Sequence, residues 1–191
     1  PYTSSIIEQI FDDAKTLTDG ANVQPERERM QLLFTGKIAI SSSDKDGKTV
    51  NFNYDYDVDG LWAKKNVKTL TGNAKWSDHT NSNPLVDIQN MVDAASLLGV
   101  NITRGIVSPA TWNDIMQNAN VKNMFRNPDG SLKVFGKAQA VQEIKTLTGV
   151  TIAVYNGAFK DENGKDKHYA EDNAIALLPD GSLGSTIYGT T

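Results

Sequence analysis

The segment Gly149–Gly189 constrains the fold more than any other part of this chain. Apolar and less apolar side chains alternate along Val150–Tyr155, with the period of two that is typical of a strand whose two faces differ. A polar excursion, Asn156–Asp172, leads to a second apolar run at Asn173–Leu178. A Pro-Asp-Gly turn and a short third strand, Ser185–Tyr188, follow. We therefore predict a β-meander on which the remainder of the chain packs.

The residues before this meander predict helices interspersed with strands. Apolar side chains recur at helical spacing in several segments that open with a capping residue or proline, or end near glycine. The predicted helices are Ser4–Thr18, Pro25–Phe34, a helix that opens at Asn83-Pro84 and ends at Gly99, Ala110–Asn118, Asn120–Arg126 and Lys137–Leu147. The first two could instead form one long helix with a kink near Gly20 and Pro25. The predicted strands are Lys37–Ser41 and Thr49–Tyr56, joined by an Asp-Gly hairpin turn, and Val100–Val107. This order indicates the α+β class, with a mixed sheet covered by helices.

A polar region in the first half of the chain divides it into parts. Gly60–Asn81 has little apolar periodicity and predicts a long connection. We therefore expect one domain at 1–60, a connection at 61–82 and a second domain at 83–191. The chain starts at Pro1 without an initiator methionine, and we expect it to be a fragment of a longer protein.

Composition excludes several kinds of function. The chain has 191 residues, a formal net charge of −4 and no cysteine, so disulfides, thiolate metal sites and cysteine nucleophiles are excluded. The acidic balance argues against a nucleic-acid binder with a basic face. The sequence has no apolar run long enough to cross a membrane, and it matches no glycine-rich phosphate-binding motif. We predict no cofactor and no metal.

Two short patterns could still carry chemistry. Asp55, Asp57, Asp59 and Gly60 match the opening of an EF-hand calcium loop, D-x-D-x-D-G, although Asn66 stands where the loop needs a glutamate. The alternative interpretation is an acidic edge strand that resists aggregation. Asp78 and His79 are adjacent, as an acid and a base of a hydrolase could be, but the sequence has no G-x-S-x-G motif. A calcium-dependent binding module and, with less support, a hydrolase are therefore the alternatives to a structural protein.

The order of motifs along the chain resembles the phage lambda-type major capsid proteins, the major capsid protein E family. In the last part, the shared features are Val154-Tyr155, Gly157, Asn163-Gly164-Lys165 with Lys167, Glu171-Asp172-Asn173 and Tyr188-Gly189. In the middle, they are Lys75-Trp76-Ser77, Asn83-Pro84, Asp87-Ile88, Gly99-Val100 and Pro109 with Trp112. A third match is the passage from helix to strand at Met30–Ile40 and the hairpin that follows to Asp57.

The resemblance implies a Hong Kong ninety-seven type capsid fold. Residues 1–60 would be the peripheral-type domain, with a spine helix and a hairpin, and 83–191 the axial-type domain. The family's N-terminal arm, extended loop and C-terminal end have no counterpart in this sequence, which agrees with a fragment.

The implied function is that of a structural, non-enzymatic head protein of a tailed phage or prophage. It would assemble with copies of itself into pentamers and hexamers and enclose DNA without specific binding. Scaffold or protease, portal and decoration proteins are further possible partners, and a membrane is not. Its place would be the capsid of the virion, after assembly in the cytoplasm of the bacterial host.

The polar excursion is the segment that the resemblance makes most interesting. Its tip concentrates both signs of charge around an Asn-Gly pair, and the resemblance implies that it projects toward the centre of a capsomer. We expect this tip to bury little surface, so that charge reversal at Lys165 and Lys167 would leave stability nearly unchanged and impair assembly.

Overall fold

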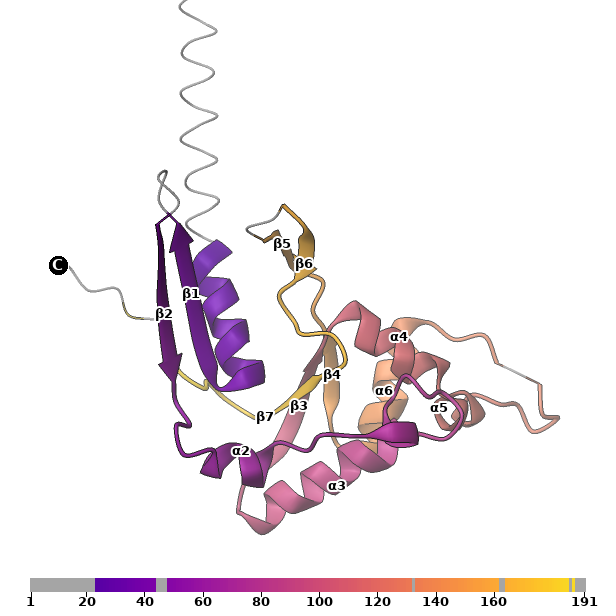
Figure 1. Cartoon of the computed structure of the whole chain (residues 1–191). Helices are drawn as coiled ribbons and strands as arrows, with labels where there is room; N and C mark the ends of the chain where they lie inside the picture. Colours follow the sequence, from indigo (N-terminus) through magenta and orange to yellow (C-terminus); the bar gives the residue numbers. More distant parts are fainter. Residues whose placement is uncertain (1–22, 44–47, 132, 162–163, 186, 188–191) are drawn as a thin grey trace, which may run out of the picture. The chain divides into compact units, whose positions relative to one another are not determined.

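A computed structural model describes residues 23–43, 48–131, 133–161, 164–185 and 187. The chain divides into two compact units (Figure 1). Unit 1 is Pro1–Asp59 with Thr186–Thr191, and unit 2 is Gly60–Ser185. The predicted helix Ser4–Thr18 lies outside the described residues, as does most of the predicted strand Ser185–Tyr188. The two described residues of that predicted strand, Ser185 and Ile187, are not in a strand.

The described part of unit 1 is one helix followed by a two-stranded antiparallel sheet. The helix covers residues 23–35, so it does not begin at Pro25 as predicted, and Gly36 ends it with a left-handed φ of 70°. Strand β1 (Lys37–Ser43) pairs with β2 (Thr49–Asp55), which confirms the predicted pairing of these strands. The predicted Asp-Gly turn between them lies outside the described residues. The Gln31 side chain of the helix accepts a hydrogen bond from the Ala39 amide (3.2 Å), so the helix contacts the outer edge of β1.

Unit 2 is built on a three-stranded mixed sheet. Strand β3 (Ile102–Val107) lies in the centre, parallel to β4 (Thr151–Val154) and antiparallel to β7 (Ile175–Pro179). The Arg104 guanidinium of β3 donates to the carbonyl oxygens of Pro179 (2.7 Å) and Gly181 (2.6 Å). These bonds hold the predicted turn at the end of β7 against the central strand.

Helical segments accompany this sheet in unit 2, and the last four of them supply core residues. They are α2 (Leu61–Asn66), the short η1 (Gly72–Ala74), α3 (Pro84–Leu97), α4 (Pro109–Gln117), α5 (Ala119–Met124) and α6 (Lys137–Thr148). Asn83 caps α3 through the Val86 amide, and Ser108 caps α4 through the Thr111 amide, as the Asn-Pro and Ser-Pro pairs predict. The buried core consists of Ile88, Ile102, Val107, Trp112, Ile115, Val121, Phe125, Ala140, Ile144, Val150 and Ile152.

The structure corrects the predicted meander. Strands β4 and β7 are not neighbours, because β3 lies between them and pairs with both. The pairing of β3 with β4 is parallel and needs the long helical crossover that α4, α5 and α6 provide. The polar excursion contains a small antiparallel hairpin of β5 (Ala158–Lys160) and β6 (Asp166–His168), which extends beyond the end of β4 (Figure 1).

The polar connection contains α2 and η1, and it clusters with unit 2. Trp76 packs against the core, and its indole donates to Asp87 (3.0 Å). Within the described ranges, none of the helices is long and apolar enough to span a bilayer.

Candidate functional site

The three aspartates of the calcium-like pattern do not form a cation site. Asp55 lies at the end of β2 and makes an ion pair with Lys37 at 2.8 Å, while its Oδ1 accepts the Asp57 amide. Hydrogen bonding to the Lys37 side chain, and to the Asp57 amide next, lowers the pKa of Asp55. Among the residues that the structure describes, no three acidic or histidine side chains are grouped to hold a metal ion. The structure therefore does not support the calcium alternative.

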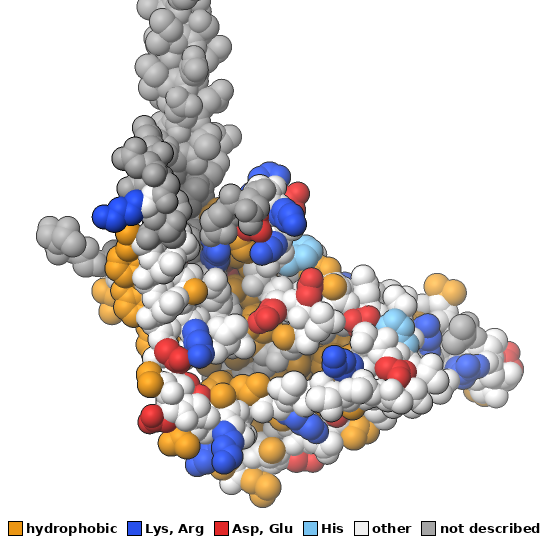
Figure 2. Space-filling view, in the orientation of Figure 1, with side chains coloured by type: hydrophobic (Ala, Val, Ile, Leu, Met, Phe, Trp, Pro, Cys, Tyr) orange, Lys and Arg blue, Asp and Glu red, His pale blue; other side chains and the backbone are white. Residues whose placement is uncertain are grey.

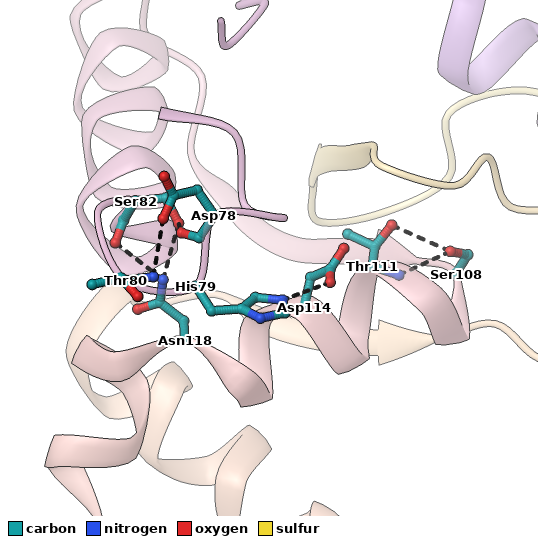
Figure 3. A network of polar contacts seen from close by, with 8 residues as sticks. All are labelled: Asp78, His79, Thr80, Ser82, Ser108, Thr111, Asp114 and Asn118. Atoms are coloured by element: carbon teal, nitrogen blue, oxygen red, sulfur yellow. Dashed lines mark hydrogen bonds and ion pairs between the residues drawn. The ribbon is translucent and has the colours of Figure 1, made fainter. Parts of the chain in front are cut away.

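His79 has an acidic partner, but it is not its neighbour in sequence. Its Nε2 lies 2.9 Å from Oδ1 of Asp114, which α4 supplies (Figure 3). Asp78 instead accepts the Thr80 and Asn81 amides, and hydrogen bonds from Asn81 lower its pKa. The carboxylate of Asp78 thus closes a turn and does not orient the imidazole.

A buried amide joins the same loop to the helices. Asn118, between α4 and α5, is fully buried and donates through Nδ2 to the carbonyl oxygen and the hydroxyl of Ser82, both at 3.0 Å (Figure 3). Its Oδ1 accepts the Asn120 amide at 2.9 Å. The Ser82 hydroxyl donates in turn to the Asp78 carbonyl at 2.7 Å. Each polar atom of Asn118 is thereby satisfied, and the loop before α3 is fixed to the start of α5.

We call the hydrogen bonds that Asn118 makes with Ser82 and Asn120 the clasp. The arrangement in Figure 3 fits a structural role better than a catalytic centre. A hydrolytic triad needs a histidine that contacts an acid through one ring nitrogen and a nucleophile through the other. The hydroxyl of Ser82 is engaged with Asp78 and Asn118, and that of Ser108 caps α4 beside Thr111. The polar groups gathered in this loop thus serve to hold elements together.

The β5–β6 hairpin stands on a small aromatic base. The Tyr169 ring lies 5.1 Å from the Phe159 ring and 6.1 Å from the Tyr155 ring, centroid to centroid. Gly157 lies between the two tyrosines, where a Cβ atom would come within 2.8 Å of Tyr155 and 2.9 Å of Tyr169. The Tyr169 amide donates to the Gly157 carbonyl at 3.0 Å, which closes the base of the hairpin.

A buried carboxylate organises the charged tip of the hairpin. The Asp161 side chain is only 4% exposed, and its Oδ2 lies 3.1 Å from Nζ of Lys167. Its Oδ1 accepts the Lys165 amide at 2.9 Å. A second ion pair, Lys160 with Asp166 at 2.9 Å, is exposed on both sides and contributes little. The roles of the two lysines therefore differ. The Lys167 ammonium neutralises the buried Asp161 carboxylate, whereas Lys165 donates to it through its backbone amide.

This difference predicts unequal effects of charge reversal. Lys167→Glu would place a second carboxylate against Asp161, so we expect it to lower the free energy of unfolding by about 1–2 kcal/mol. Lys165→Glu keeps its backbone bonds to Asp161 and serves as the matched control, with a change of less than about 0.5 kcal/mol. Urea unfolding of both variants measures the difference. Equal free energies of unfolding would mean that neither lysine contributes to stability, as the sequence alone indicates. The double reversal of Lys165 and Lys167 would then test assembly without a change in stability.

Two partnerships in this part of the chain escape sequence analysis. Asp114 lies 35 positions from His79, and no local pattern relates them. The burial of Asp161 is equally hidden, because charged and polar residues stand on both sides of it, from Lys160 to Lys167.

Comparisons with known proteins place the chain in a family. The family model for phage major capsid protein E matches residues 3–191. A crystal structure of a protein assigned as a prophage capsid protein in E. coli CFT073 aligns with a TM-score of 0.54 and 18% identity over 87% of this chain and 47% of that one. A phage-related protein from Bordetella bronchiseptica RB50 aligns with a TM-score of 0.50 and 16% identity, over 85% and 43%. A search of curated proteins found no match.

The match over nearly the whole length shows that the chain belongs to the phage major capsid protein E family. The predicted resemblance and the α+β class are thus confirmed, and the fold agrees with that of the two solved structures. The chain spans less than half the length of either. The family match gives no support to the calcium module or the hydrolase.

Proposed function

We propose that this chain is part of a major capsid subunit that assembles into the icosahedral shell of a tailed phage or prophage. The observation that carries the proposal is the family match over residues 3–191. A closed shell is made from copies of one subunit, so its functional sites are surfaces that neighbouring copies share.

The two domains of a Hong Kong ninety-seven type subunit would divide the chain near residue 60, where the boundary between the two compact units also lies. Residues 1–60, with the helix and the β1–β2 hairpin, would be the peripheral-type domain. Residues 83–191 would be the axial-type domain, with 61–82 as the connection. The central sheet of unit 2, crossed by helices, supports a body rigid enough to present loops at a symmetry axis.

The β5–β6 hairpin is the surface feature of unit 2 that best suits contacts around such an axis. Its tip bears both signs of charge, and a surface of this kind can meet its own copy after rotation. In more detail, the subunits would form pentamers and hexamers that enclose DNA without specific binding. The virions would be assembled in the bacterial cytoplasm. Scaffold or protease, portal and decoration proteins would be further partners, and the subunit would be neither an enzyme nor a cofactor protein.

Expression of the complete protein in bacteria tests this function. We expect capsomers or closed shells in the soluble extract, visible by negative-stain electron microscopy and sedimenting far faster than one subunit. The sedimentation profile at several protein concentrations separates assembly from aggregation. A protein that stays monomeric at every concentration, with the other head proteins co-expressed, would contradict the proposal.

A further inference from the structure

The charge of the chain changes sign abruptly at Asp59. Residues 49–59 contain three aspartates and no lysine or arginine, whereas residues 60–77 contain four lysines and no acidic residue. We call residues 55–59 the acidic run and residues 60–77 the basic segment. Since the chain as a whole carries −4, a stretch of eighteen residues without an acid is a local reversal of its balance. The reversal coincides with the boundary between the two units.

The basic segment exposes apolar as well as charged surface. Its helix α2 has no buried residue, and Lys64 and Lys65 occupy its last turn. Leu61 is 63% exposed, Trp62 54% and Val67 52%. In the space-filling view, basic and hydrophobic side chains lie next to one another where Figure 1 labels α2 (Figure 2). Exposed large apolar side chains with polar groups around them are typical of a protein contact surface.

The composition of this surface favours a protein partner over DNA. Lysines that bind duplex phosphates draw their affinity from charge alone, and exposed Leu61 and Val67 would gain nothing from such a partner. A partner with acidic and apolar groups would match both features. The acidic run has this composition, because Tyr56 (68% exposed) and Val58 (81% exposed) alternate with its aspartates. Every copy of the chain therefore carries one surface and its complement.

We propose that the basic segment of one copy binds the acidic run of a neighbouring copy. The inference rests on the proposed function and names one of the contacts that assembly would use. The two surfaces differ, so the contact is head-to-tail, and contacts of this kind close into rings when the rotation permits. Complementary charge would set the register of the contact, and the apolar side chains would supply buried area.

Two charge reversals and their mixture test the proposal in the complete protein. The first variant is Lys64→Glu with Lys65→Glu, and the second is Asp57→Lys with Asp59→Lys. Each alone opposes like charges at the contact, so we expect association, measured by sedimentation velocity at about 100 mM salt, to weaken at least tenfold. An equal mixture of the two variants pairs opposite charges again, and we expect it to associate within a few-fold of the unaltered protein. Restoration by mixing requires that the two runs meet between copies.

The controls separate this contact from other causes. Lys122→Glu with Lys133→Glu makes the same change in net charge as the first variant, at two exposed lysines elsewhere in unit 2. We expect this control to associate normally. Thermal unfolding of every variant checks folding. Asp59→Lys alone replaces the second variant if the substitution at Asp57 disturbs the structure.

Each other outcome overturns the proposal. A mixture that stays dissociated would show that the runs do not meet between copies, and an equal defect in the control pair would assign the effect to net charge. Normal association of the Lys64 and Lys65 variant, with loss of binding to a short DNA duplex, would make DNA the partner. Failure of the unaltered protein to assemble would contradict the proposed function itself and is visible before any variant is made.

Discussion

Replacement of Asn118 by alanine is expected to lower the free energy of unfolding of unit 2 by about 3 kcal/mol. The substitution removes the two bonds that Nδ2 donates to Ser82 and the bond that Oδ1 accepts from the Asn120 amide. The Ser82 carbonyl oxygen still accepts from Asn120 Nδ2 at 3.1 Å, but the Asn120 backbone amide loses its acceptor. The cost of leaving that part-buried amide unpaired adds to the lost bonds. Urea unfolding followed by tryptophan fluorescence measures the effect, since Trp112 is buried in α4 nearby in sequence.

Asn123→Ala is the matched control for this experiment. Asn123 lies on α5, the helix that Asn118 caps, but its exposed side chain accepts a bond from Arg126 Nε at 2.8 Å. We expect a change of less than about 1 kcal/mol. If the two variants were equally stable, the buried amide would not be what fixes the loop before α3, and the clasp would be an incidental arrangement.

The local signals in the sequence locate the helices well, because each depends on residues a few positions apart. Asn83-Pro84 and Ser108-Pro109 begin α3 and α4 through side chains that accept amide hydrogen bonds three residues on. Gly149 ends α6 with a left-handed φ of 74°, a conformation that glycine adopts without strain. The start at Pro25 fails because Val23 and Gln24, which precede the proline, are already helical.

Strand partners and side-chain partners are harder to predict, because distant residues decide them. The alternation in β4 and the apolar run of β7 identify both as strands, but nothing in either shows that β3 lies between them. The same limit applies to the site. Adjacency suggests Asp78 as the partner of His79, and the fold provides Asp114 instead. A count of charges cannot distinguish Lys165 from Lys167, since only the burial of Asp161 does so.

Gly157→Ala is expected to lower the free energy of unfolding of unit 2 by about 1–3 kcal/mol and to loosen the β5–β6 hairpin. The added methyl group would overlap the rings of Tyr155 and Tyr169, so at least one ring must leave its present position. Because Tyr169 also contacts Phe159, a displaced ring would disturb the aromatic base on which the hairpin stands. Faster amide hydrogen exchange at Tyr169, whose amide donates to the Gly157 carbonyl, would report the loosening.

Gly184→Ala controls for the loss of a glycine as such. An added methyl group at Gly184 meets no atom within 4 Å, and its φ lies outside the left-handed region. We expect its stability to stay within about 0.5 kcal/mol of the original chain. Unchanged exchange at Tyr169 in the Gly157 variant would mean that the tyrosines move aside at little cost. The hairpin would then be held by Asp161 and its lysine, and the aromatic base would contribute little to its position.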